Sequence, residues 1–348
     1  MSEITREEFS KIYNEQFVPR LKDLEIERAE VQRKTQPIGI ITIVAFVICV
    51  IGFFIQNGYC IGIGFLVAVP CIIYASSLQQ KIRVKLKKEI ISKILSLYGN
   101  LYFSEKKDLI SSRDIDNMGL FPRFATKYND DIIVGIHKGC NFIINECKLE
   151  HTERRGKSSV TVTDFSGLLI KIQMNKKFSG KTIVGMKGDI TKLRGYEAVE
   201  LEDVDFMKNK KVYSTDQIEA RYILTTSFME RLKALGNTFS QDRMSKHQYA
   251  TPQEKQLADN AAKTVENIKN NQSWFGKLAN SLLDYEIGVC AAFIDGYVYL
   301  FVPSGEDFFE IDISSTLYNK EKYYNVYVEL QSILAIIDYL KLDTKLGL

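Results

Sequence analysis

Two histidines and two cysteines within fifteen residues are the first candidates for chemistry, because such a set could bind zinc. The residues are His137, Cys140, Cys147 and His151. The pattern from Cys140 to Cys147 predicts one extended strand, which rises about 3.3 Å per residue and would hold its ends more than about 20 Å apart. Zinc ligands lie roughly 2.0 to 2.3 Å from the metal, so the strand would have to fold back to close a site. We therefore predict ordinary strand and hairpin residues here, and no metal or other cofactor.

A second motif, Ser179-Gly180-Lys181-Thr182, matches the end of a phosphate-binding loop. The complete motif begins with a glycine five positions before the glycine of the Gly-Lys pair, and a helix follows it. This chain has Asn175 at the first of those places, and its pattern from Thr182 onward predicts a strand. The sequence therefore argues against nucleotide binding at this motif.

Three charged residues, Asp216, Glu219 and Arg221, make up the remaining candidate site. They lie on a predicted helix, where the spacings from Asp216 to Glu219 and to Arg221 also suit helix capping and surface pairing. No serine, cysteine or carboxylate of the chain stands in a recognisable nucleophile motif. We expect a protein that is not an enzyme. The alternative is a membrane-bound enzyme with a site near these three residues.

Composition narrows the classes further. The chain has 348 residues, with 46 Lys and Arg against 43 Asp and Glu, for a formal net charge of +3. A nucleic-acid-binding protein normally has a strongly basic face, so this near balance predicts no nucleic-acid partner. The 6 cysteines are too few and too scattered for a disulfide framework, and we expect free thiols.

The elements that must position these residues are organised around an uncharged apolar stretch, residues 38–76. The turn Gln56-Asn57-Gly58-Tyr59 divides it into two halves. Each half suffices for a short crossing, since a helix rises about 1.5 Å per residue and the hydrocarbon core is roughly 30 Å thick. A helix in a soluble core would keep a polar stripe, which neither half has. The pattern predicts a two-helix transmembrane hairpin with the lipid bilayer as its partner.

Basic residues flank this hairpin on both sides and are absent from its turn. The positive-inside rule then makes both termini cytoplasmic and the turn external, which predicts a multi-pass plasma-membrane protein. The basic residues that follow the second half would be attracted to anionic lipid. They are Lys81, Arg83, Lys85, Lys87 and Lys88.

The hairpin divides the chain into four predicted parts. These are a cytoplasmic amphipathic helix at 1–36, the transmembrane hairpin at 37–77, a juxtamembrane basic helix at 78–98 and a cytoplasmic α+β domain at 99–348. In the first helix, Thr5 and Glu8 have the spacing of a capping box. Its apolar stripe should pack on the protein's own body or on a second copy, or else lie along the lipid surface. The stripe comprises Phe9, Tyr13, Phe17, Leu21 and Leu24.

Short strands joined by short turns follow residue 99 and predict a mostly antiparallel sheet with packing helices, a fold of the α+β class. The strongest hairpin signal is Asp295-Gly296, since both central positions of a type I′ turn need φ > 0. The strands around it, at 289–302, would be marginal as a lone hairpin, so we expect them to join the earlier sheet. The packing helices are predicted at 216–235 and 324–342.

Two local features of this domain can also be predicted. The polar run at 153–157 should form a turn between strands. On the helix that starts at residue 216, we expect Ile218, Tyr222 and Ile223 to face the core.

A polar insertion at 237–287 interrupts the domain and has its own apolar cluster, Trp274, Phe275 and Leu278. Adjacent large aromatics after a polar run have two expected uses here. They could cap the sheet, or they could form an exposed anchor for a partner or for the lipid interface.

Three stretches of the chain carry a family resemblance: 165–169 with 177–182, then 212–225, then 292–296. They resemble an uncharacterised family of bacterial two-pass membrane proteins, the domain of unknown function numbered thirty-one thirty-seven. The resemblance extends over most of the chain, although the insertion at 237–287 departs from it. It implies a bacterial inner-membrane location and brings no established activity, cofactor or catalytic residue.

From these features we expect a membrane-anchored, cytoplasm-facing binding or scaffold protein. Its partner would be a second copy of the chain or another membrane protein. The expectation of a binding role follows from the absence of a recognisable set of reacting side chains, since fold alone supplies no chemistry.

Overall fold

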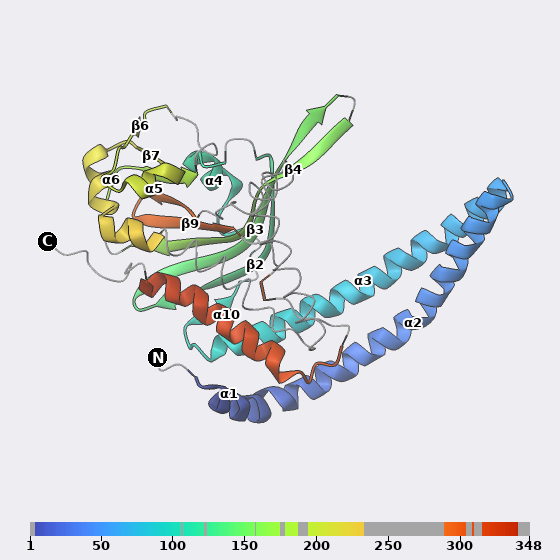
Figure 1. Cartoon of the computed structure of the whole chain (residues 1–348). Coiled ribbons are helices and arrows are strands. Elements are labelled where there is room, and N and C mark those ends of the chain that lie inside the picture. The colour runs from blue at the N-terminus through green and yellow to red at the C-terminus, as the bar shows by residue number, and fades with distance from the viewer. Residues whose placement is uncertain are drawn as a thin grey trace, which may run out of the picture. The chain divides into compact units, whose positions relative to one another are not determined.

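The computed structural model describes residues 4–104, 106, 108–121, 124–156, 158–174, 178–186, 194–232, 289–303, 308–309 and 315–339 (Figure 1). The chain divides into two compact units. The helical unit comprises residues 1–103 and 308–332, and the sheet unit comprises residues 104–307 and 333–348. The predicted α+β class, with an N-terminal helical region, two long apolar helices and an antiparallel sheet domain, is confirmed.

The helical unit is built from a nearly continuous N-terminal helix and a second long helix. Its elements are α1 (Arg6–Ile12), η1 (Tyr13–Phe17), α2 (Val18–Phe54), α3 (Gly58–Ser96) and the short strand β1 (Leu101–Phe103). The predicted capping box is present, because the Thr5 side chain accepts a hydrogen bond from the backbone N–H of Glu8, and the Glu8 carboxylate accepts one from the backbone N–H of Thr5. This pairing satisfies donors that the first helical turn leaves free.

The segment η1 is a turn of π-helix that ends two residues before Pro19. Proline has no backbone N–H and cannot close the usual hydrogen bond to the carbonyl of Glu15. The chain widens one turn earlier, and the N–H of Val18 bonds to the carbonyl of Tyr13. The widened turn is the local accommodation that π-bulges provide inside helices.

The apolar stripe of α1 and η1 is buried within the protein. Phe9, Tyr13 and Phe17 pack against tyrosines of helix α10 (Lys320–Tyr339). Ring centroids are 5.2 Å apart for Phe9 and Tyr324, and 5.9 Å apart for Tyr13 and Tyr323. Of the sequence alternatives, packing on the protein's own body is the correct one, and these rings are not available to a lipid surface.

Helices α2 and α3 form a long hairpin with a tight turn at Gln56 and Asn57. The Asn57 side chain accepts hydrogen bonds from the N–H groups of Tyr59 and Cys60 and so caps α3. The two helices approach closely at glycines. A Cβ on Gly64 would lie 2.2 Å from Cys49 Sγ, and one on Gly52 would lie 2.7 Å from Cys60 Cβ. Small residues allow such approach between membrane helices.

The sheet unit contains strands that pair in the order β2-β3-β4-β9-β8-β5-β7-β6. Their bounds are β2 (Thr126–His137), β3 (Cys140–Arg155), β4 (Ser158–Gln173), β5 (Thr182–Met186), β6 (Glu197–Ala198), β7 (Lys210–Ser214), β8 (Cys290–Ile294) and β9 (Tyr297–Pro303). Its short helices include α4 (Ser112–Met118), α5 (Val204–Asn209) and α6 (Gln217–Ile223). Each of these strand pairs is antiparallel, as the short connecting turns predicted.

The hairpin of β8 and β9 lies in the middle of this sheet. Asp295 and Gly296 have φ of 52° and 77°, which confirms the predicted turn. Strand β9 pairs with β4, and β8 pairs with β5. The expectation that this late hairpin joins the earlier strands is therefore confirmed.

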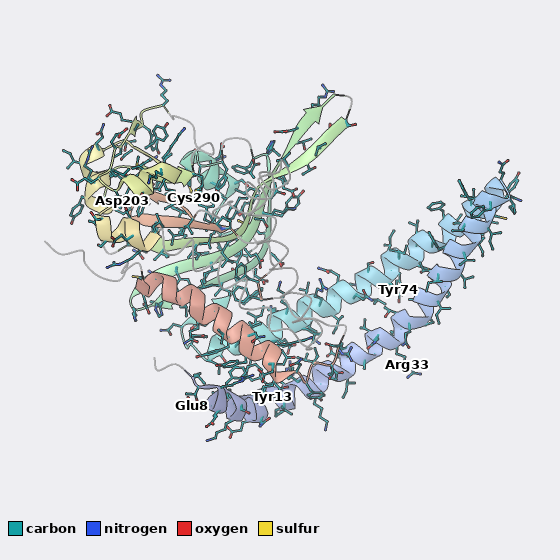
Figure 2. The ribbon with its side chains drawn as sticks, in the orientation of Figure 1. Glu8, Tyr13, Arg33, Tyr74, Asp203 and Cys290 are labelled. Carbon is teal, nitrogen blue, oxygen red and sulfur yellow. The ribbon has the colours of Figure 1, made fainter. Side chains whose placement is uncertain are left out.

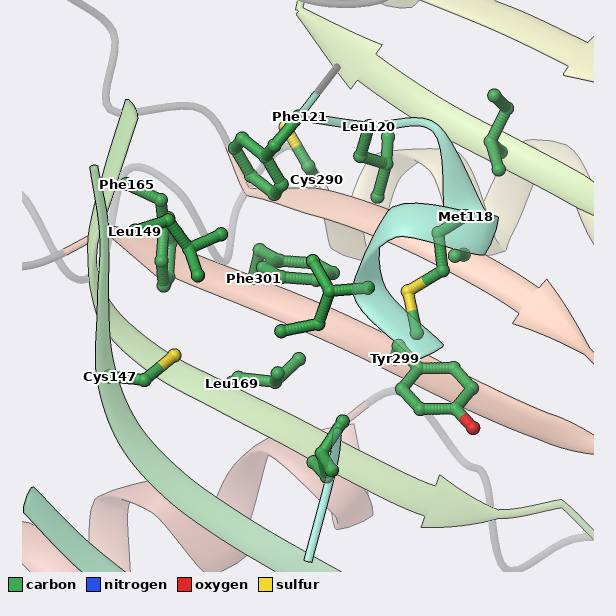
Figure 3. Packing of buried hydrophobic residues seen from close by; sticks show 14 of the residues in the cluster. Met118, Leu120, Phe121, Cys147, Leu149, Phe165, Leu169, Cys290, Tyr299 and Phe301 are labelled. Atoms are coloured by element: carbon green, nitrogen blue, oxygen red, sulfur yellow. The ribbon is translucent and has the colours of Figure 1, made fainter. Parts of the chain in front are cut away.

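One face of the sheet carries an aromatic core under α4 (Figure 3). Phe301 of β9 packs against Phe121 and Phe165, with ring centroids 4.9 and 5.4 Å apart. Cys147, Leu149 and other apolar side chains complete the cluster. Because α4 ends at Gly119 with φ of 69°, the chain turns sharply there and places Leu120 and Phe121 over the sheet.

Two local predictions were wrong. The turn predicted at 153–157 is shorter, because β3 continues to Arg155 and β4 begins at Ser158. On α6, Ile218 and Tyr222 face outward and are 83% and 46% exposed, whereas Ala220 and Ile223 are buried. A helix of two turns buries a single narrow face, and Ala220 with Ile223 occupies it.

Candidate functional site

The junction between β5 and α6 joins the Ser-Gly-Lys-Thr motif to the charged helix. The Glu219 carboxylate accepts hydrogen bonds from the backbone N–H groups of Ser179, at 2.9 Å, and Gly180, at 2.5 Å. Two successive backbone N–H groups of this kind form an anion-binding concavity. Here the anion is a carboxylate of the protein itself, so the feature that resembled a phosphate loop holds α6 against β5.

Gly180 is required for this arrangement by its small size. A Cβ at this position would lie 2.3 Å from Glu219 Oε2 and 3.1 Å from the Cβ of Asp216. Any other residue would therefore push the carboxylate away from its two donors.

Hydroxyl groups extend the junction into the sheet. Thr182 Oγ1 and Ser214 Oγ are 2.9 Å apart and both residues are fully buried. Ser214 Oγ also lies 3.1 Å from the carbonyl oxygen of Lys181 and 2.8 Å from that of Asp216. Its single proton can serve one of these acceptors at a time. Lys181 and Thr215 are linked in both directions, because the Lys181 N–H donates to Thr215 Oγ1 and the Thr215 N–H donates to the Lys181 carbonyl.

The other two charged candidates also support the fold. Asp216 Oδ1 accepts from the N–H groups of Ile218 and Glu219, each at 2.9 Å, and caps α6. Arg221 donates to the carbonyl of Gln217 at 3.1 Å and to that of Glu200 at 3.4 Å. The structure therefore brings Asp216 and Glu219 to one junction and gives all three side chains hydrogen-bond partners within the protein.

The four residues of the zinc hypothesis have separate surroundings. His137 Nε2 lies 2.9 Å from Asp338 Oδ1, whereas His151 Nδ1 lies 2.7 Å from Asp164 Oδ2. Cys140 and Cys147 are buried, and desolvation raises the pKa of the Cys147 thiol to about 12. All six cysteines are free thiols in the structure, as expected from the sequence.

A different acidic group went unnoticed in the sequence. Among the described residues, Asp130, Asp131 and Glu146 place carboxylate oxygens within 4.8 Å of one another. A register shift between Asn129 and Ile132 creates the group, because it sets two successive aspartates opposite one residue of β3. The signal in the sequence was the polar run Asn129-Asp130-Asp131 directly before the apolar run Ile132-Ile133-Val134. Asp131 and Glu146 are buried, Asp130 is exposed, and all three residues take part in further interactions within the protein.

The remaining predicted contact residues are placed as follows. Lys85 pairs with Glu27 at 2.6 Å, and Lys87 is buried, with 7% of its surface exposed. Lys81 and Arg83 lie on the exposed side of α3, and Lys88 makes interactions of its own. Anionic-lipid binding by this cluster stays a prediction. Trp274, Phe275 and Leu278, with the whole insertion at 237–287, lie outside the described residues.

The hairpin of α2 and α3 has a large exposed apolar surface. Two windows of α2 and α3 have mean hydropathies of 2.7 and 2.1, and only 11% of each is buried. Tyr59, Phe54 and Leu66 are 85%, 79% and 76% exposed, and Tyr74 is 55% exposed. Figure 2 shows Tyr74 on helix α3 of this hairpin. Exposed apolar area on this scale marks an interaction surface, and two helices of this length and composition suggest membrane association.

Comparison with known proteins supports the family resemblance. Residues 163–248 and 275–342 match the family model described as a protein of unknown function, DUF3137. The suspected domain of unknown function is confirmed. The DUF3137 match includes the Ser-Gly-Lys-Thr motif, α6 and the β8–β9 hairpin, so the junction around Glu219 lies within it.

No curated protein matches the chain. Among solved structures, the mycobacterial trehalose monomycolate transport factor A, TtfA, aligns with 8% sequence identity and a TM-score of 0.31. The alignment covers 72% of this chain and 95% of that one. A TM-score this low establishes neither a shared fold nor a shared function.

Proposed function

We propose that the protein is a membrane-anchored binding or scaffold protein whose sheet unit lies on the cytoplasmic side of a bacterial inner membrane. The observation that carries this proposal is the exposure of the apolar hairpin, of which only 11% is buried in either window. In water this surface would be costly, at roughly 25 cal/mol for each Å² of apolar area. In a bilayer the same side chains meet hydrocarbon.

The orientation rests on charge. Arg33 and Lys34 precede the first apolar half, Lys81 and Arg83 follow the second, and the turn at 56–59 has no basic residue. Cytoplasmic segments next to membrane spans carry the excess of Lys and Arg. Both ends of the chain would then be cytoplasmic.

A binding role is favoured over catalysis by how the charged candidates are used. Asp216 caps a helix, Glu219 fills a backbone concavity, and Arg221 donates to carbonyl oxygens. Side chains engaged in this way stabilise the fold. The partner would be a second copy of the chain or another membrane protein.

Alkaline carbonate extraction of bacterial membranes tests the anchor. We expect the full chain to stay in the membrane pellet, and a variant with Ile43→Lys and Leu66→Lys to move to the soluble fraction. Both residues are exposed in the structure, Ile43 at 65% and Leu66 at 76%. Recovery of the unaltered chain in the carbonate wash would contradict the proposal.

The binding role is tested by cross-linking in intact membranes, followed by release of the complexes in mild detergent. We expect the chain in complexes larger than its own mass of 39.8 kDa, and the charged hairpin variant at that mass alone. A purely monomeric chain in the native membrane would contradict a scaffold role.

A further inference from the structure

Strands β3 and β4 continue past their neighbours in the sheet as an outer hairpin, from residue 151 to residue 163 (Figure 1). On one side, the pairing of β2 with β3 stops at Glu150. On the other side, the pairing of β9 with β4 begins at Gly167. Within the part of the chain that the structure describes, both edges of the outer hairpin are therefore open to a further strand.

The two open edges differ in charge. The β3 edge carries His151, Glu153 and Arg154. The β4 edge reads Ser158-Ser159-Val160-Thr161-Val162-Thr163, and none of these residues is charged. Charged residues are one of the means by which natural sheets protect an edge, and an exposed edge without them is a template for another strand. Val160 is 39% exposed, so the β4 edge presents apolar area as well as backbone groups.

The β4 edge matches a second copy of itself in antiparallel register. A two-fold axis at Thr161 places this residue opposite itself and Val160 opposite Val162 of the second copy. Opposed β-branched residues stabilise antiparallel strand pairs. A slip of one residue would place each valine opposite a serine or a threonine, so the register about Thr161 is favoured.

The charges of β3 agree with pairing through β4. In a four-stranded sheet built from two copies, one row of side chains would run from Arg154 to Glu150 of the second copy. The next row would run from Glu153 to His151 of the second copy, and neither row joins like charges. A two-fold pairing of the open β3 residues, 151–155, would instead place Glu153 opposite its own copy. Like charges directly opposite each other destabilise a strand pair.

We propose that the sheet unit pairs with a second copy of the chain through the β4 edge of the outer hairpin, in antiparallel register about Thr161. The two outer hairpins form one four-stranded sheet with β4 and its copy in the centre. The interface is isologous, since both copies contribute the same residues. The inference rests on the proposed binding role and names its partner as a second copy of the chain.

The contact is small and depends on the membrane. Stable interfaces between soluble proteins bury about 1,200 to 2,000 Å² in total, which is more than one short strand pair provides. Two copies anchored in one membrane meet at a raised effective concentration, and a small contact then suffices. The pairing is therefore tested in native membranes and not in detergent.

Cysteine cross-linking of the full-length chain tests the register. Cys49, Cys60 and Cys71 are first replaced by alanine, because they are partly exposed, whereas the other three cysteines are buried. Thr161→Cys and Ser159→Cys are then introduced separately, both at exposed positions of β4. In the proposed register, the Cβ atoms of the two residues 161 are about 4.5 to 5.5 Å apart, close to the separation in a disulfide. The two residues 159 are displaced by four residues, or about 13 Å.

Under a mild oxidant, we expect Thr161→Cys to give a product of twice the chain mass, and Ser159→Cys to give at most about a fifth as much. Equal cross-linking at the two positions, or none at Thr161→Cys, would overturn the proposal. Linkage of Thr161→Cys to a protein of another mass would also overturn it, and would leave the binding role standing with a different partner. Carbonate extraction of the same membranes reports the anchor separately, whether or not cross-links form.

A second arm tests the valine contact in the Thr161→Cys protein. Val160→Lys with Val162→Lys places lysines opposite each other and should lower the cross-linked yield at least about fivefold. Val160→Lys with Val162→Glu places unlike charges opposite each other and should keep the yield within about twofold. The reversed pair, Val160→Glu with Val162→Lys, should do the same. An equal loss in all three variants would overturn the register, because the yield would then not depend on which residues face each other.

Discussion

The carboxylate of Glu219 shows how a motif can be structural although it resembles a binding loop. Its partners, Ser179 and Gly180, lie about forty residues earlier in the chain, and the hydrogen bonds have lengths of 2.9 and 2.5 Å. The strand that the sequence predicted after this motif is present as β5. The role of Glu219 could not be predicted, because no local pattern tells which side chain will reach a backbone concavity from another element.

Removing the Glu219 carboxylate should weaken this junction. We expect Glu219→Ala to lower the free energy of unfolding by about 1 to 3 kcal/mol, because two backbone donors lose a charged acceptor. Glu202→Ala, at an exposed position of the same unit, is the control and should change it by less than about 0.5 kcal/mol. The measurement is chemical unfolding of the full chain in detergent. Equal effects of the two substitutions would show that the junction contributes nothing specific.

His151 should make the outer β3–β4 hairpin, the part of the two strands from residue 151 to residue 163, sensitive to pH. Hydrogen bonds to Asp164 and, second, to Glu153 raise its pKa above the ordinary value of 6.5. The protonated ring therefore stabilises the folded state fully below pH 6.5, and the stabilisation is lost as the pH rises through the raised pKa. Hydrogen exchange of residues 151–163 should accelerate over that range more than base catalysis alone explains.

The His151→Gln variant supplies the matched comparison. Its outer hairpin should show exchange that follows base catalysis at every pH. If the unaltered chain and the variant had the same pH profile, the ion pairs around His151 would have no part in the stability of the hairpin.

At the scale of elements, the sequence was most informative where a turn or a cap has its own chemistry. The Thr5–Glu8 capping box and the Asp295-Gly296 turn were predicted from residue types alone, because the requirement is local. The outward direction of Ile218 was not, since a two-turn helix carries too few residues to define its buried face. The shift in register at Asp130 and Asp131 likewise depends on the strand opposite.

The close packing of α2 against α3 gives a prediction for the hairpin. Gly64→Leu should destabilise it by about 1 to 3 kcal/mol, because the new side chain overlaps Cys49 and the backbone of Ala45. Gly62→Leu points into open space and should leave stability unchanged. Thermal unfolding of the two variants in the same detergent compares them directly. A Gly64→Leu protein as stable as Gly62→Leu would mean that the helices do not meet at these glycines.

At the scale of the molecule, the order of the strands explains why β4 and β5 need strands that come more than a hundred residues later in the chain to complete the sheet. The β8–β9 hairpin separates β4 from β5 in the sheet, and Phe301 of β9 reaches the aromatic core. Local sequence predicted the hairpin but not its central place, which depends on pairings across more than a hundred residues. The four predicted parts of the chain and the use of the Trp274 cluster stay predictions.

Deleting residues 288–348 should therefore unfold the sheet unit. The deletion removes both central strands and leaves β4 and β5 without a neighbour on one side. Limited proteolysis should degrade the shortened chain quickly, whereas the full chain should give protected fragments. A stable, protease-resistant fragment ending near residue 236 would contradict this arrangement.

The central claim is a membrane anchor with both ends in the cytoplasm, and cysteine labelling of intact cells tests it most directly. Native Cys140, Cys147 and Cys290 are buried and unsuited as reporters, so all six native cysteines are replaced by alanine. Single cysteines are then introduced at two exposed positions, by Gly58→Cys in the hairpin turn and Ser159→Cys in β4. An impermeant maleimide should label Gly58→Cys in intact cells and Ser159→Cys only after permeabilisation. Labelling of Ser159→Cys from outside intact cells would contradict the account.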